Sequence, residues 1–285
     1  MKKLFVTLIL PAVLLLGRAA PAQSHDPTLD EPLLDAASTG NYPVVQRLLE
    51  NGAAIETTDA DGQTPLLKAA NTGQVHIVML LLDKGANIEA AGNLPEIEGR
   101  TALMEAAFKG YTEIVLLLLD KGANIEAADR HGLTALFLAV AGTGNPHIVR
   151  ILLGRNAYTE VKDDDDETPL IKAAGMGRAP LVKVLLEQQH IDLEAKDKHD
   201  NTALLAAAAG GYAEIVKLLI DKGADVNPQN DQGQTALDIA TDQEFADIVT
   251  MLKEHGAKAK PVKPAPADAA PQPATPKEGD DPKPN

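Results

Sequence analysis

The stretch from Asp61 to Ala90 returns in altered forms through most of the chain, and this repetition constrains the fold more than any other feature. It opens with an Asp-Gly turn dipeptide, and Thr64 followed by Pro65 has the pattern of a helix N-cap with proline in the first turn. Gly73 and Gly85 can adopt the left-handed conformation that ends a helix. One unit is therefore predicted to be a turn followed by two antiparallel helices.

The threonine that opens the first helix of the unit recurs at nearly constant spacing. After Thr64 it stands at Thr101, Thr134, Thr168, Thr202 and Thr235, at intervals of 37, 33, 34, 34 and 33 residues. A period near 33 residues indicates a stacked array in which each unit buries its apolar face against its neighbours. The absence of cysteine and the 3% of aromatic residues suit such an array better than a compact enzyme core.

Two further motifs return with the threonine. The lines Gly99 to Leu103, Gly132 to Leu136 and Gly233 to Leu237 match one another, and Ile-Val pairs recur in the second helices. Over about residues 29 to 258 this pattern resembles the ankyrin repeat. The resemblance implies an all-α ankyrin-repeat solenoid of about seven helix-turn-helix units with short hairpin loops, which we call fingers. It also implies a concave groove, lined by the first helices, that binds other proteins.

The units are predicted at about residues 27–60, 61–97, 98–129, 130–163, 164–197, 198–230 and 231–258. The first and last have the altered sequences expected of caps, because a terminal unit has one face without a neighbour. Residues 91–98 lengthen the finger between the second and third units and place Leu94 and Ile97 on it. These two side chains are either contact residues or folded back on the stack.

Several units replace a glycine by a residue that can adopt the same geometry. Asn156 stands at the end of the fourth unit's second helix, Asp166 and Asp200 stand at finger turns, and Glu244 stands between the last two helices. The fifth unit has 187–190 in place of the usual Asp-Lys-Gly-Ala, with one residue more, so the sequence defines the end of its second helix least well.

The two ends of the chain have compositions of their own. Residues 1–22 have the Lys-Lys start, short apolar run and small-residue cleavage site of a signal peptide, so the mature chain is expected to begin at Gln23 in the periplasm or outside the cell, with no membrane span. Residues 259–285 are rich in Pro, Ala and Lys and are expected to be a disordered tail. A monomer is expected.

Charge restricts the class of partner. Removal of the signal peptide leaves 23 Lys and Arg against 41 Asp and Glu, a net charge of −18. Nucleic acid is an unfavourable partner for such a surface, because phosphate contacts need clustered basic residues. The expected partner is another protein.

The sequence offers no set of residues for catalysis. Only Ser24 and Ser38 are serines, thiol chemistry is impossible without cysteine, and the histidines lack metal-ligand spacing. His131, Asp165 and His199 occupy equivalent finger positions, but the 8–10 Å spacing of packed helices predicts that they lie too far apart for a proton relay. No enzymatic activity, cofactor or resident metal is expected.

The acidic finger, residues 163–167, is the sharpest local feature of the sequence. Solvated charge is the simplest interpretation. The alternatives are a docking patch for a basic partner or a site for Ca²⁺, although five adjacent carboxylates lack the spacing of a dedicated calcium loop.

The resemblance places partner contacts on the finger tips and on the last exposed turn of each first helix. Those positions are Asn71, Arg100, Phe108, Lys109, Arg130, His131, Leu133, Met176, Lys198, His199 and Asn201. Phe108 and Met176 stand out as apolar residues just before an inter-helix glycine, with local packing against the next first helix as the alternative. The sequence thus favours a non-catalytic, exported binding scaffold that shields or regulates another exported protein. The competing function is a Ca²⁺-responsive envelope component that uses the acidic finger and the tail.

Overall fold

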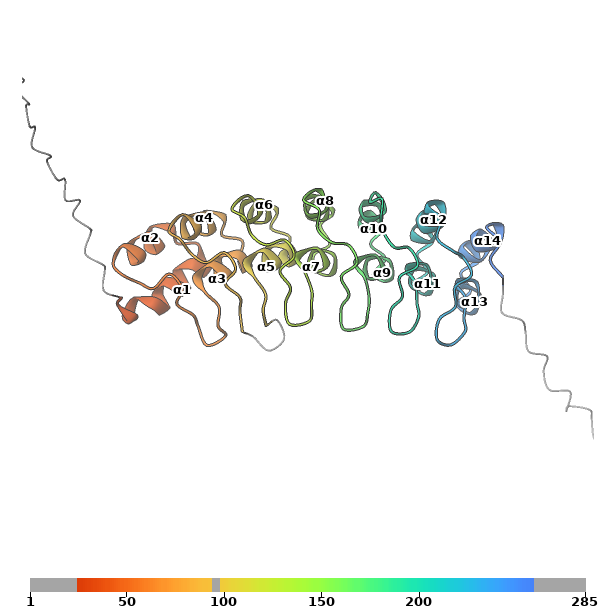
Figure 1. The fold of residues 1–285 in the computed structure, drawn as a ribbon, viewed down its shortest axis with the longest axis horizontal. Helices are drawn as coiled ribbons and strands as arrows, with labels where there is room; N and C mark the ends of the chain where they lie inside the picture. Colours follow the sequence, from red (N-terminus) through yellow and green to blue (C-terminus); the bar gives the residue numbers. More distant parts are fainter. Residues whose placement is uncertain (1–24, 94–97, 259–285) are drawn as a thin grey trace, which may run out of the picture.

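A computed structural model of the chain describes residues 25–93 and 98–258. The predicted signal peptide, Leu94 and Ile97 of the longer finger, and the predicted tail lie outside the described residues. In the described part the chain forms a single row of helical hairpins, with the fingers projecting from one side (Figure 1). None of the helices described is long and apolar enough to cross a membrane.

Each unit contributes one helix to each of two layers. The first helices are α1 (Asp30–Thr39), α3 (Pro65–Asn71), α5 (Ala102–Lys109), α7 (Ala135–Ala141), α9 (Pro169–Gly175), α11 (Ala203–Ala209) and α13 (Ala236–Asp242). The second helices are α2 (Tyr42–Glu50), α4 (Val75–Asp83), α6 (Thr112–Asp120), α8 (Pro146–Gly154), α10 (Ala179–Leu186), α12 (Ala213–Lys222) and α14 (Ala246–Glu254). A short 3-10 helix, η1 (Pro27–Leu29), precedes α1.

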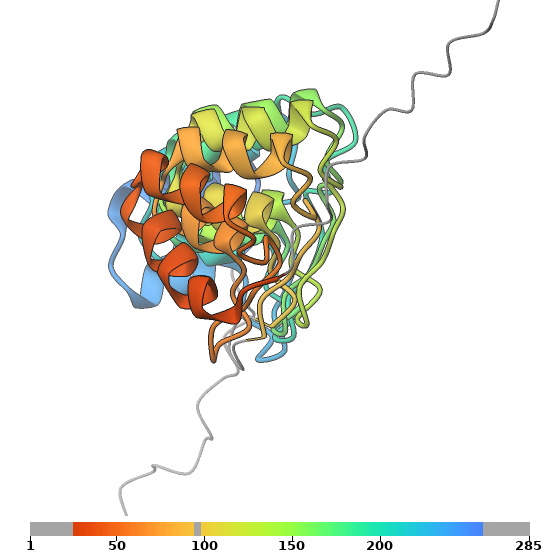
Figure 2. The same ribbon diagram turned by 90° about the vertical axis from the view of Figure 1, so that its left-hand side faces the viewer.

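The layers stack regularly. Each first helix packs on the first helix of the next unit, and each second helix packs on the next second helix. Figure 2 looks along this stack and shows the finger loops gathered at one edge. One continuous core runs from Leu33 in α1 to Leu252 in α14, so stability is shared between units, as the repeat period predicts.

The six opening threonines share an extended backbone conformation, but only three of them make the capping hydrogen bond. The side chains of Thr64, Thr168 and Thr235 accept a hydrogen bond from the backbone three residues later, as predicted for an N-cap. Thr101 and Thr134 have the same extended backbone, yet their buried hydroxyls have no hydrogen-bond partner among the described residues, as is also true of Thr202. The threonine motif therefore specifies the backbone conformation in all six units that carry it and the capping bond in three of them.

The residues that replace glycine adopt glycine's conformation. Asn156, Asp166, Asp200 and Glu244 are the described non-glycine residues with positive φ, at 60–62°. In the fifth unit, α10 ends at Leu186 without a left-handed residue, which agrees with its altered sequence.

A ladder of hydrogen bonds joins every unit to the next. Near the end of each of the first six units, a Glu or Asn side chain accepts from a backbone nitrogen of the following unit, at 2.7–3.3 Å. The acceptors are Glu56, Glu89, Glu126, Glu160, Glu194 and Asn227. The segment between a second helix and the next finger is therefore a regular inter-unit joint.

Candidate protein-binding surface

A single acceptor organises each of five finger turns. The Oδ1 atom of the first finger residue accepts from the backbone nitrogens two and four residues later, at 2.8–3.1 Å. The residues that supply it are Asp59, Asp129, Asp163, Asp197 and Asn230. In the described part of the longer finger, which precedes the third unit, an isolated bridge joins Ala91 to Thr101.

Neighbouring fingers are hydrogen-bonded to one another. The backbone nitrogens of Asn93, Arg130, Lys198 and Asp231 donate to carbonyls of the preceding finger, at 2.8–3.1 Å. These bonds cover four of the five junctions between fingers, and the His131–Asp164 pair joins the finger at 129–133 to the finger at 163–167, so the fingers form a rim along the array.

Two histidine–carboxylate pairs reinforce this rim. His131 Nδ1 lies 2.6 Å from Asp164 Oδ2, and His199 Nδ1 lies 3.1 Å from Asp231 Oδ2. The hydrogen bond to Asp231 raises the pKa of His199. His131 thus pairs with Asp164 of the acidic finger and His199 pairs with Asp231, and neither of these carboxylates belongs to the relay considered from the sequence.

Carboxylates of the acidic finger form ion pairs with a lysine of the same unit. Lys172 Nζ lies 3.2 Å from Asp163 and also bonds Glu167, and these bonds raise the pKa of Lys172 even though partial burial opposes them. Among the residues that the structure describes, no group of three or more His, Asp or Glu side chains is placed to hold a metal ion. The geometry of this finger therefore gives no support to the calcium interpretation.

Arg100 is the centre of a buried cluster between the third and fourth units. Its Nε lies 3.3 Å from Asp129 Oδ2, and its Nη1 lies 3.7 Å from Glu105 Oε1. The guanidinium also stands 5.2 Å from the ring centroid of Phe108. The side chains of Asp129 and Arg100 are 0% and 13% exposed. Arg100 therefore contacts the adjacent finger and presents little of its side chain to solvent.

The cluster compensates for a change of sequence on the first helices. Lys68 and Lys172 each bind the Asp that organises their own finger. At the matching positions the third unit has Glu105 and the fourth has Leu138, so Asp129 has no such lysine in its own unit. Arg100 from the preceding finger neutralises it instead.

Phe108 and Met176 differ in environment. Phe108 is half-buried and packs against the core, and its carbonyl accepts from the backbone nitrogen of Thr143 at 3.0 Å. A side chain on Gly142 would lie 2.1 Å from this carbonyl, so the glycine allows the two units to approach. Phe108 therefore packs locally, as in the alternative weighed for it, and its contact with a partner stays a prediction. Met176 is 42% exposed at the end of α9.

The remaining predicted residues lie along the fingers and the first-helix ends. Lys109, Arg130, Lys198 and His199 are exposed, and Arg130 Nη1 lies 3.5 Å from Glu98. Asn71, His131, Leu133 and Asn201 are half-buried, and Leu133 packs on the core. Binding of a partner by these residues stays a prediction.

Comparison with known families decides the family. The family model described as "Ankyrin repeats (3 copies)" matches residues 33–129, 126–197 and 189–262. This chain is an ankyrin-repeat protein. The crystal structure of the human ASB11 ankyrin repeat domain is similar to it with a TM-score of 0.69 and 27% sequence identity, over 80% of this chain and 99% of that one. No curated protein matches the chain.

Sequence reasoning missed several residues of the rim of this ankyrin-repeat protein. Glu98, Asp164 and Asp231 each pair with a residue of an adjacent finger, and Glu105 and Asp129 enclose Arg100. A signal was present, because opposite charges recur about one repeat apart at neighbouring finger positions. In each pair, the partner stands one residue away from the position that is equivalent in the repeat, as Asp164 stands one residue before Asp165. An alignment that compares only equivalent positions therefore overlooks these pairs.

Proposed function

We propose that this ankyrin-repeat protein is an exported, non-catalytic scaffold that binds another protein and thereby shields or regulates it. The observation that carries the proposal is that every finger is bonded to the next, by a backbone hydrogen bond at four junctions and by the His131–Asp164 pair at the fifth. Side chains on successive fingers then keep fixed spacings before a partner arrives, which lowers the conformational cost of binding. Exposed Lys109 and Met176 stand at the first-helix ends of the same array.

Two exposed methionines allow a matched test of the binding face. Met176 ends a first helix and is 42% exposed, whereas Met79 lies on second helix α4 and is 41% exposed. Removal of an exposed side chain changes stability little, so both alanine variants are expected to melt near the wild type. Met176→Ala should weaken capture of a partner from the envelope fraction, by on the order of tenfold if it is a central anchor.

The control variant Met79→Ala shows whether the partner binds the first-helix face or the second-helix face. Met79→Ala is expected to capture the partner as well as the wild type does. The opposite pattern, with capture lost in Met79→Ala and kept in Met176→Ala, would place binding on the second-helix face and would contradict the groove proposal.

Export is supported by the charged start, apolar run and small-residue site within residues 1–22. Intact-mass spectrometry of fractionated cells tests it directly. A chain that begins at Gln23 and lies outside the cytoplasm is the expected result, and a full-length chain in the cytosol would contradict it.

A further inference from the structure

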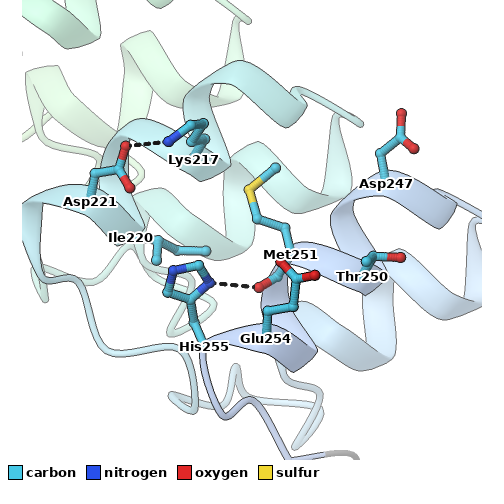
Figure 3. A pocket seen from close by; sticks show the side chains of 8 residues that line it. All are labelled: Lys217, Ile220, Asp221, Asp247, Thr250, Met251, Glu254 and His255. Carbon is cyan, nitrogen blue, oxygen red and sulfur yellow. Dashed lines mark hydrogen bonds and ion pairs between the residues drawn. The ribbon is translucent and has the colours of Figure 1, made fainter.

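A groove of about 360 Å³ lies between second helices α12 and α14, on the side of the array away from the fingers (Figure 3). Ile220 and Met251 form its apolar part. Polar side chains border them, among which Asp221, Asp247 and Glu254 are acidic. The groove therefore combines an apolar floor with a predominantly negative border.

Ion pairs cross the corresponding junctions in the middle of the array. Lys121 reaches Asp83, Arg155 reaches Asp120, Arg150 reaches Glu187 and Lys183 reaches Glu214, each joining neighbouring second helices or their ends. Within the part of the chain that the structure describes, no ion pair joins α12 to α14.

The lysine that faces this last junction turns back on its own helix. Lys217 pairs with Asp221, one turn further along α12, at 2.7 Å (Figure 3). Asp247 and Glu254 on α14 are exposed and form no ion pair in the described residues. A cation from elsewhere could neutralise them at small desolvation cost.

The chain itself carries a complementary segment next to the groove. Lys258, Lys260 and Lys263 are followed by no acidic residue until Asp268, although the whole chain has a net charge of −15. Pro261, Val262 and Pro264 give the same segment apolar character. The segment begins close by: Lys258 is bonded through its backbone nitrogen to Asn227 Oδ1 at 2.9 Å, only three residues after His255, which lines the groove.

We propose that residues 259–266 of the chain fold back into the groove between α12 and α14. The apolar part of the segment covers Ile220 and Met251, and Lys260 and Lys263 pair with the carboxylates of α14. Five residues of an extended proline-rich segment span about 15 Å, similar to the length of the α14 face. Tethering makes the contact intramolecular, so weak interactions suffice. The segment would close the last second-helix junction, and the expectation of a disordered tail would apply beyond it.

Disulfide trapping in the full chain tests the proposal, because the natural sequence has no cysteine. Thr250→Cys places a thiol on the groove, and Lys253→Cys places one on an exposed part of α14 that does not line it. Each is combined with Val262→Cys. A docked segment should form the 250–262 disulfide at least about tenfold faster than the 253–262 disulfide, even though the latter closes the shorter loop.

Charge reversal provides the matched control. Lys260→Glu with Lys263→Glu should reduce the 250–262 rate to within about twofold of the 253–262 rate, as should 0.5 M salt. Equal rates for both pairs in the unreversed chain would overturn the proposal. A disulfide that forms only between two chains, at a rate that rises with protein concentration, would also overturn it, because the occupant would then be a second copy.

Discussion

The Oε1 atom of Glu89 accepts a hydrogen bond of 2.7 Å from the backbone nitrogen of Asn124, one unit further along the array. A side-chain oxygen makes the equivalent contact at each of the five other junctions between units. A solenoid has no long-range contacts beyond its neighbours, so each such joint acts directly on the coupling between two units.

We expect Glu89→Ala to lower the free energy of unfolding by about 1 kcal/mol, because a backbone donor loses its charged acceptor at a partly exposed site. Glu89→Gln keeps an acceptor oxygen and should lose less. Urea denaturation of both variants measures the difference. Equal losses would mean that the charge of Glu89, and not its hydrogen bond, stabilises the joint.

Arg100 is expected to be among the most sensitive polar residues of the array. Arg100→Met would leave the fully buried carboxylate of Asp129 without its cation, at a cost of about 3–5 kcal/mol. Arg130→Met, in the next finger, changes the same residue type at a 47% exposed side chain and should cost less than about 1 kcal/mol. Denaturant melts compare the two, and similar losses would show that Asp129 finds another partner.

The buried carboxyl of Glu105 is expected to make the free energy of unfolding depend on pH. Burial raises the pKa of this carboxyl above its ordinary value of 4.5, against the opposing effects of Arg100 and Lys109. A raised folded-state pKa gives stability that is present below about pH 4.5 and is lost as the pH rises through the folded pKa. Glu105→Gln should therefore be more stable than the wild type near pH 7, with the difference shrinking towards pH 4. A difference that is constant with pH would contradict this assignment.

Two glycines allow a paired test of packing between units. Gly142→Ala brings a methyl group against the backbone carbonyl of Phe108, so we expect a loss of about 1–3 kcal/mol. Gly154→Ala, at the end of α8, meets nothing within 4 Å and should stabilise the helix by up to about 1 kcal/mol. Thermal melts of the two variants should move in opposite directions, and a neutral Gly142→Ala would show that the two units can separate at that point.

The sequence by itself determined the repeat, its helices and its turns. Local chemistry accounts for this: Thr64 and Pro65 start a helix, and Asp166 and Asp200 tolerate the left-handed turn that glycine adopts elsewhere. Such choices depend on a few neighbouring residues, so they can be predicted without knowledge of the stack.

Only the tertiary structure decided which side chains meet between units. Arg100 is 13% exposed and pairs with Asp129 of the adjacent finger, and His131 meets Asp164 and not the equivalent Asp165. Phe108 packs locally because Gly142 lets the neighbouring unit approach, whereas Met176 stays exposed. These outcomes depend on the offset between adjacent fingers, which is set by the stacking of whole helices and has no signature in a single repeat.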